Sequence, residues 1–224
     1  MHKFDRQVGL LLSGGLDSAV LLGRLLSQDI VVQPIYIQSQ LIWQEAEYAW
    51  LARLLKAMES PSLRSAVVLD LPLGDLYGDH WAVTGVKTPA AGTADDAVYL
   101  PGRNVLLAVK AMLWCQLHGL DELALGILGS NPFADATPEF FVAFEALLNS
   151  ATGKSVRLVR PLARLDKRQV MELGRNLPLE LTFSCIAPVG ELHCGQCNKC
   201  RERQIAFHSI GLPDPTRYAR CPIP

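Results

Sequence analysis

Short apolar runs alternate with stretches of helical periodicity along this chain of 224 residues, and that alternation most constrains its fold. The apolar runs predict strands at 7–12, 30–37, 63–71, 122–128 and 156–162. The periodic stretches predict helices at 18–28, 41–59, 104–119, 139–151 and 166–177. Strands that are joined through helices pair in parallel. We therefore predict an α/β fold in which helices cover both faces of a parallel sheet.

Composition narrows the class of protein. Half of the residues are apolar and 19% are charged, which excludes a disordered chain. With 21 basic against 22 acidic residues there is no electrostatic footprint for nucleic acid, so we expect a small-molecule substrate. No apolar run reaches the roughly 18 residues of a membrane span, and the N-terminus lacks the core of a secretory signal. We expect a cytoplasmic protein without a membrane partner.

The predicted elements suggest one large domain with a small appendage. Residues 1–180 hold the strand and helix alternation, and residues 181–224 hold a cluster of four cysteines. Between them the chain has no linker of the kind that separates two large domains. The segment 72–103 is rich in Gly, Pro, Asp and Thr, and a loop of that length inside a domain is usually functional. We interpret it as a lid or substrate loop.

The turn after the first predicted strand reads Ser-Gly-Gly-Leu-Asp-Ser, from Ser13 to Ser18. Glycines at 14 and 15 permit positive φ and let a phosphate approach the backbone without a Cβ in the way. The two serine hydroxyls add donors, and the following helix directs the positive end of its dipole toward an anion. The pattern matches neither the P-loop nor the dinucleotide-binding motif. We predict a phosphate site of another kind.

The cysteines Cys185, Cys194, Cys197 and Cys200 form a C-x8-C-x2-C-x2-C array. Such spacing brings four thiolates close enough to share one tetrahedral ion, and zinc is its natural occupant. An iron–sulfur cluster is the alternative, and His193 is a possible replacement ligand. Four protein ligands leave no open position for water, so we expect a structural metal rather than a catalytic one.

The turn resembles the S-G-G-x-D-S signature of the PP-loop ATP pyrophosphatase superfamily. Three further segments, LPGRN at 100–104, RPLARLDKRQV at 160–170 and the cysteine segment at 184–207, make most of the chain similar to the 7-cyano-7-deazaguanine synthase family. The resemblance implies an adenine nucleotide alpha hydrolase-like fold. Members of that family use ATP to activate the carboxylate of 7-carboxy-7-deazaguanine, form its amide with ammonia and dehydrate the amide to a nitrile, on the route to queuosine.

The resemblance also implies roles for single residues. Asp17 would hold Mg²⁺ or an amine, Lys167 would meet the leaving pyrophosphate, and Arg103 would pair with phosphate or the substrate carboxylate. The alternatives are a helix cap for Asp17, an exposed helix lysine for Lys167 and a packed rim arginine for Arg103. The expected nucleotide-binding residues are Leu12, Ser13, Gly14, Gly15, Leu16, Asp17, Ser18 and Asn104, the last also a helix cap.

The chain departs from the family pattern where substrate should be recognised. The family's Tyr-Gly-Gln-Arg-His-like stretch is YIQSQ here, which keeps Tyr36 and Gln38 but has no Arg-His. The Tyr-Pro-Asp-Cys-Arg-like segment is NPFADATPEFF, in which Asp135 stands in for the acid. Such a carboxylate could accept two N–H bonds from a guanine-like edge. We predict Tyr36, Gln38 and Asp135 as substrate residues.

Three functions remain open at this stage. The first is an ATP-dependent carbon–nitrogen ligase of the 7-cyano-7-deazaguanine synthase type, working as a homodimer. The second is a PP-loop paralogue that adenylates another carboxylate or a tRNA base. The third is a nucleotide-binding module without catalysis.

Overall fold

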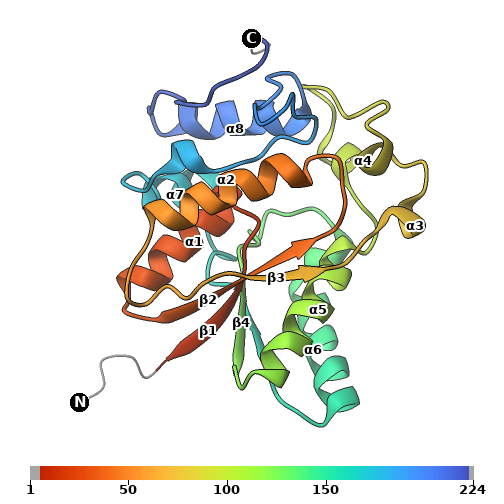
Figure 1. Ribbon diagram of the computed structural model, residues 1–224, viewed down its shortest axis with the longest axis vertical. Helices are drawn as coiled ribbons and strands as arrows, with labels where there is room; N and C mark the ends of the chain where they lie inside the picture. The colour runs from red at the N-terminus through yellow and green to blue at the C-terminus, as the bar shows by residue number, and fades with distance from the viewer. Residues whose placement is uncertain (1–5, 222–224) are drawn as a thin grey trace.

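The computed structural model describes residues 6–221 and contains one five-stranded sheet, in the order β3-β2-β1-β4-β5 (Figure 1). All four strand pairings are parallel. The strands are β1 Gln7–Leu11, β2 Val31–Gln38, β3 Val67–Asp70, β4 Glu122–Leu125 and β5 Arg157–Val159. The parallel α/β fold predicted from the strand and helix alternation is confirmed.

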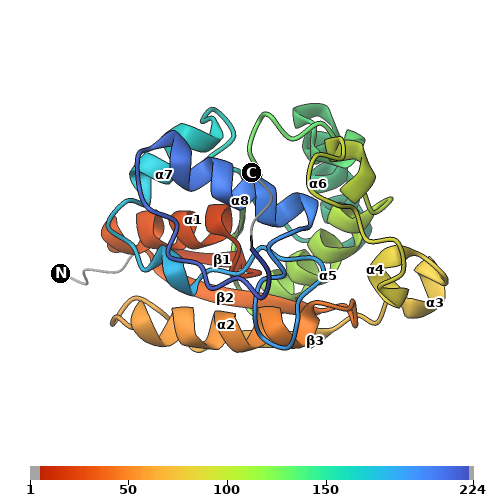
Figure 2. The ribbon, with the colours of Figure 1, turned by 90° about the horizontal axis from the view of Figure 1, so that it is seen from above.

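Six longer helices pack around this sheet. They are α1 Leu16–Ser27, α2 Gln44–Ala57, α5 Arg103–Leu117, α6 Pro138–Thr152, α7 Lys167–Leu173 and α8 Asn198–Ser209. Figure 1 shows α1, α2 and α7 on one side of the sheet and α5 and α6 on the other. Figure 2 shows α8 lying across the top of the molecule, above α1. The predicted cover of both faces is therefore present.

Side chains of the central strands point alternately to the two faces of the sheet, and each face has its own hydrophobic core. Val8 and Leu10 of β1 belong to the core on the side of α1 and α7, together with Ala124 of β4. Leu123 and Leu125 of β4 belong to the core on the side of α5 and α6. Because both faces are covered, the central strands are apolar on both, as parallel sheets require. Polar ligand-binding groups are thus confined to the ends of the strands.

The segment 72–103 is more ordered than a loop. It contains the short helices α3 Gly74–Tyr77 and α4 Trp81–Thr84 and the 3-10 turn η1 Asp95–Val98. Two further 3-10 turns, η2 Ala134–Ala136 and η3 Leu179–Leu181, follow later in the chain. A third hydrophobic core contains Ala82 of α4 together with the four cysteines. The segment therefore packs against the C-terminal part of the chain.

Several helix boundaries differ from the predicted ones. Helix α5 begins at Arg103 with Gly102 at its N-cap, so the prediction that Asn104 caps it was wrong. Gly102 has a φ of +71°, which favours glycine there. Helix α7 ends at Leu173 rather than 177, and a Cβ on the following Gly174 would meet a methyl of Val20 at 2.4 Å. Helix α8 was not predicted, because its charged sequence has no apolar stripe.

Gly126, directly after β4, packs closely against the start of α1, so a larger residue at this position should destabilise the fold. A Cβ on Gly126 would lie 3.0 Å from the Cα and 3.1 Å from the N of Ser18, both rigid backbone atoms. We expect Gly126→Ala to lower the free energy of unfolding by about 1–3 kcal/mol, as overpacking does. Gly74→Ala is the matched control, since its Cβ would meet nothing within 4 Å. Equal unfolding midpoints in urea would contradict this reading.

Candidate functional site

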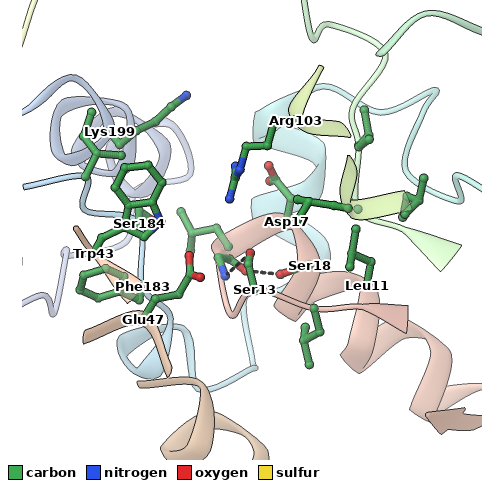
Figure 3. A pocket seen from close by; sticks show the side chains of 18 of the residues that line it. Leu11, Ser13, Asp17, Ser18, Trp43, Glu47, Arg103, Phe183, Ser184 and Lys199 are labelled. Carbon is green, nitrogen blue, oxygen red and sulfur yellow. Dashed lines mark hydrogen bonds between the residues drawn. The ribbon is translucent and has the colours of Figure 1, made fainter. Parts of the chain in front are cut away.

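A cavity of about 340 Å³ opens at the carboxyl ends of β1, β2 and β4 (Figure 3). Ligands of open α/β sheets bind at this edge, because strand-to-helix turns present backbone N–H groups there. The turn after β1, the helices α2 and α5, the start of α7 and residues near the cysteine cluster form its walls. Its polar lining residues are Ser13, Asp17, Ser18, Tyr36, Glu47, Arg103, Asn104, Lys167, Ser184, Lys199, Glu202 and Arg203.

The turn between β1 and α1 has the geometry of an anion site. Gly14 has a φ of +79°, which L side chains rarely adopt, and Gly15 is the N-cap of α1. The Ser13 hydroxyl accepts a bond from the Gly15 N–H at 3.4 Å, and the Ser18 hydroxyl donates to the Gly15 carbonyl at 3.1 Å. Except for Gly14, every predicted nucleotide-binding residue of the turn lines the cavity. The structure therefore combines free helix N-terminal amides with a cavity large enough for a ligand.

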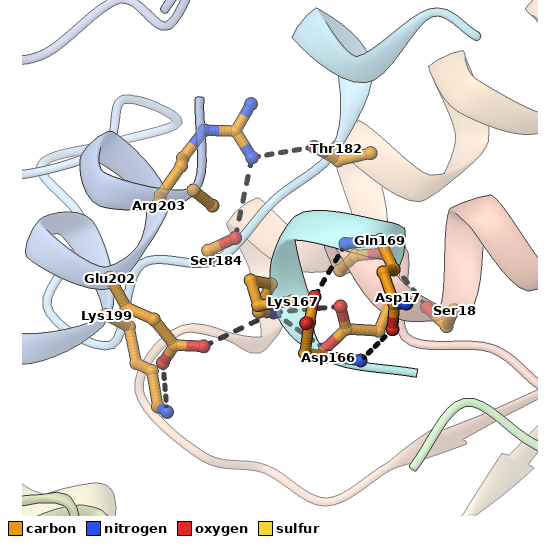
Figure 4. A network of polar contacts seen from close by, with 12 residues as sticks. Asp17, Ser18, Asp166, Lys167, Gln169, Thr182, Ser184, Lys199, Glu202 and Arg203 are labelled. Carbon is orange, nitrogen blue, oxygen red and sulfur yellow. Dashed lines mark hydrogen bonds and ion pairs between the residues drawn. The ribbon is translucent and has the colours of Figure 1, made fainter. Parts of the chain in front are cut away.

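Lys167 lies between two carboxylates at this end of the cavity. Its ammonium is 2.8 Å from both oxygens of Asp17 and 3.3 Å from Glu202, which also pairs with Lys199 at 2.5 Å (Figure 4). Burial alone lowers the pKa of Lys167, but attraction to Asp17 and Glu202 outweighs it and raises the pKa. Lys167 is therefore charged at neutral pH. Asp17 is no helix cap here, because Gly15 holds that position.

Arg103 reaches into the other end of the cavity. Figure 3 shows its guanidinium directed inward, and its Cζ lies 5.9 Å from the centre of the Trp43 ring. Its Nε is buried and has no hydrogen-bond partner among the described residues. A buried donor without a partner costs free energy unless a ligand supplies an acceptor. The geometry is consistent with binding of an anionic group by Arg103.

Asp135 and Gln38 are placed away from this cavity, and neither is among the described residues that line it. The Asp135 carboxylate accepts bonds from the backbone N–H of Asn104 at 3.0 Å and from its side-chain amide at 3.2 Å. Asp135 is 6% exposed, and its carboxylate accepts a backbone N–H in the first turn of α5 that has no partner within the helix. Of the three predicted substrate residues, the structure brings only Tyr36 to the cavity wall.

Glu47 of α2 is one of the polar lining residues that the sequence analysis missed, together with Ser184, Lys199, Glu202 and Arg203. The Tyr36 hydroxyl donates to its Oε1 at 3.0 Å. Burial raises the pKa of Glu47 to about 7, and the Arg103 charge and the Tyr36 hydrogen bond oppose that rise. Glu47 lies four residues after Trp43, on the apolar stripe of its helix. A carboxylate on that stripe was the signal that could have identified it.

The four cysteines form a closed cluster beside the cavity. Their sulfurs all lie within 4.8 Å of one another, and all four side chains are buried. Backbone N–H groups donate to three of these sulfurs, including that of Cys194 to Cys185 at 3.2 Å. Donors of this kind stabilise thiolates, so the cluster fits a metal ion. His193 is directed elsewhere, since its Nε2 accepts the Ser184 N–H at 3.1 Å.

Comparison with known families decides where the chain belongs. A family model described as "Queuosine biosynthesis protein QueC" matches residues 7–211. The chain belongs to the QueC family. Among its relatives, the 7-cyano-7-deazaguanine synthase of Thiobacillus denitrificans is 33% identical over 225 residues, covering 94% of this chain and 97% of that protein. The Stenotrophomonas maltophilia synthase is 33% identical over 223 residues, covering 94% and 98%.

The fold of the QueC chain is shared with a solved structure of another protein. A structure described as a 4-thiouridine synthetase–RNA complex with bound ATP superimposes with a TM-score of 0.52 at 17% identity. It covers 92% of this chain, which spans 50% of that protein. The PP-loop, adenine nucleotide alpha hydrolase-like fold predicted from the signature is confirmed. Across residues 6–221, no helix has the length and apolarity to cross a membrane.

The raised pKa of Glu47 predicts how stability depends on pH. The folded protein holds the Glu47 proton more tightly than the unfolded chain, whose pKa is near 4.5. Wild-type stability should therefore fall as pH rises from about 4.5 to about 7, and the loss is complete above that range. Glutamine at position 47 does not titrate. The melting temperature of Glu47→Gln minus that of wild type should therefore increase between pH 5 and pH 8. A difference that stays constant over this range would refute the assignment.

Proposed function

We propose that this chain is an ATP-dependent ligase that converts 7-carboxy-7-deazaguanine to 7-cyano-7-deazaguanine in queuosine biosynthesis. One observation carries the proposal: a single cavity holds both the anion-binding turn 13–18 and a ring-lined end with Arg103. Membership of the QueC family and the names of its relatives support it. Such a cavity could bring a triphosphate and a carboxylate into contact.

The phosphate end supplies electrostatic stabilisation in this proposal. Amides of the turn and the Ser13 and Ser18 hydroxyls would bind the terminal phosphates. As pyrophosphate leaves, the charged Lys167 would offset its developing negative charge. Asp17 would hold a Mg²⁺ ion, which neutralises phosphate oxygens when bound. Glu202 pairs with Lys167 and with Lys199, so its proposed role is to position Lys167.

The chemistry requires activation because carboxylate oxygens are poor leaving groups. With Arg103 binding the carboxylate, one of its oxygens attacks the α-phosphorus of ATP, and pyrophosphate leaves. Ammonia then attacks the carbonyl carbon, and AMP departs with that oxygen to leave the amide. The amide oxygen must also leave before a nitrile forms, so a second activation of the same kind is needed. Both steps use the same turn and the same cation.

We expect the purified protein to form the nitrile and AMP from 7-carboxy-7-deazaguanine, ATP, Mg²⁺ and ammonia, as detected by mass spectrometry. Asp17→Asn should abolish nucleotide turnover, because it removes the proposed Mg²⁺ ligand. It should also melt at a somewhat lower temperature, because Lys167 then keeps only Glu202 as a charged partner. Asp121→Asn, an exposed position just before β4 at the far edge of the sheet, is the control. Full activity in Asp17→Asn would remove Asp17 from the site. AMP release without nitrile would favour a paralogue that uses another carboxylate.

We also propose that the cysteine cluster holds one structural zinc ion. Zinc binding should contribute folding free energy, because the ligands converge only in the folded chain. We expect Cys200→Ser to lose zinc, measured by atomic absorption, and to melt at a lower temperature. Cys221→Ser, at an exposed cysteine outside the cluster, should change neither. An absorption spectrum typical of iron–sulfur clusters in the purified protein would contradict the zinc assignment.

The homodimer, the cytoplasmic location and the division of the chain near residue 180 stay predictions. The same holds for the nucleotide-binding role of Asn104, whose side chain lines the cavity while its amide bonds to Asp135.

A further inference from the structure

The two ends of the cavity differ in chemistry. Charged groups gather at the turn 13–18 and Lys167, where phosphates would bind. The lining also contains the rings of Tyr36, Trp43 and Phe183, and Glu47 is the acidic residue that bonds to one of them, Tyr36. Figure 3 shows the Glu47 carboxylate turned into the cavity beside Phe183. Flat aromatic surfaces around one carboxylate are suited to a planar ring that carries N–H donors.

We propose that Glu47 is the specificity-determining residue for the substrate ring, accepting N–H bonds from the adjacent ring N–H and 2-amino groups of a guanine-like base. This inference rests on the proposed function, because that function names the substrate. It reassigns the acid expected at Asp135 to a residue on another helix. The sequence placed that acid after the fourth strand, whereas the structure places a carboxylate in the cavity from α2.

Hydrogen bonding distinguishes the two acids. Both oxygens of Asp135 accept bonds from Asn104, and Asp135 is not among the described residues that line the cavity. Glu47 accepts one bond, from Tyr36 to its Oε1, and among the described residues its Oε2 has no donor. A carboxylate has about four acceptor sites, so Glu47 retains room for ligand donors. Tyr36 also restrains the carboxylate, which reduces the entropy lost when a ligand binds.

The edge of the base explains why Glu47 would select the substrate over the nucleotide. A guanine-like edge offers two neighbouring donors, the ring N–H and the 2-amino group, and both match a carboxylate. The corresponding edge of adenine pairs an amino donor with a ring acceptor, which faces a carboxylate oxygen unfavourably. Arg103, whose charge acts on Glu47 and whose Nε has no partner among the described residues, would bind the substrate carboxylate.

The test compares wild type, Glu47→Gln and the control Glu45→Gln, which lies on an exposed position of the same helix. Binding of 7-carboxy-7-deazaguanine is measured by calorimetry, and KM by steady-state kinetics. An analogue without the 2-amino group is the second ligand. We expect Glu47→Gln to weaken binding of the full substrate about 10- to 100-fold and to leave the KM for ATP unchanged. It should also remove most of the preference for the 2-amino group.

If Glu47 had only a structural role, Glu47→Gln would not change the preference for the ligand that carries the 2-amino group. If Glu47→Gln still prefers the 2-amino compound as wild type does, or raises the KM for ATP instead, the inference is overturned. Glu47→Asp keeps the charge and should restore part of the preference, which guards against a folding defect in the glutamine variant. Wild type that binds the substrate but forms no nitrile would refute the proposed function alone. Absence of binding by wild type would overturn both.

Discussion

The partly buried ammonium of Lys167 joins three parts of the chain that are far apart in sequence. Asp17 comes from the first helix, Lys167 from the start of α7 and Glu202 from α8. Partial burial makes an ammonium costly without compensating charges, so the ion pairs with Asp17 and Glu202 favour the meeting of these three elements. The same constraint keeps a positive charge beside the anion-binding turn. In the proposed function, this same ion-pair network would hold the cation that the phosphates of ATP require.

The cysteine cluster includes the start of α8 and so fixes the position of that helix. Cys197 is the N-cap of α8 and Cys200 lies in its first turn, so a bound metal would hold the start of this helix. From there α8 brings Lys199 and Glu202 to the cavity wall, and Figure 4 shows Glu202 between Lys199 and Lys167. A metal bound by these cysteines would therefore act on the candidate active site through the position of this helix.

Arg203 secures the same arrangement from the buried face of α8. Its side chain is almost fully buried, and its guanidinium donates to the Thr182 hydroxyl at 2.6 Å and to the Leu179 carbonyl at 2.8 Å. Burial lowers the pKa of Arg203, while Asp214 opposes that shift. Because these partners precede the cysteine cluster, Arg203 ties α8 to the segment that carries Phe183 into the cavity.

Local patterns in the sequence determined the parallel sheet, the glycine turn after β1 and the four cysteines. Each depends on residues close together in the chain: alternating apolar runs, two glycines between serines, and cysteines spaced for one ion. Only the tertiary structure decided which acid faces the cavity. Asp135 accepts hydrogen bonds from Asn104, which is 31 residues away in the sequence. Glu47 faces the cavity because α2 packs beside it and Tyr36 donates a hydrogen bond to its carboxylate. Side-chain direction in a shared cavity depends on long-range packing, which spacing along the chain does not encode.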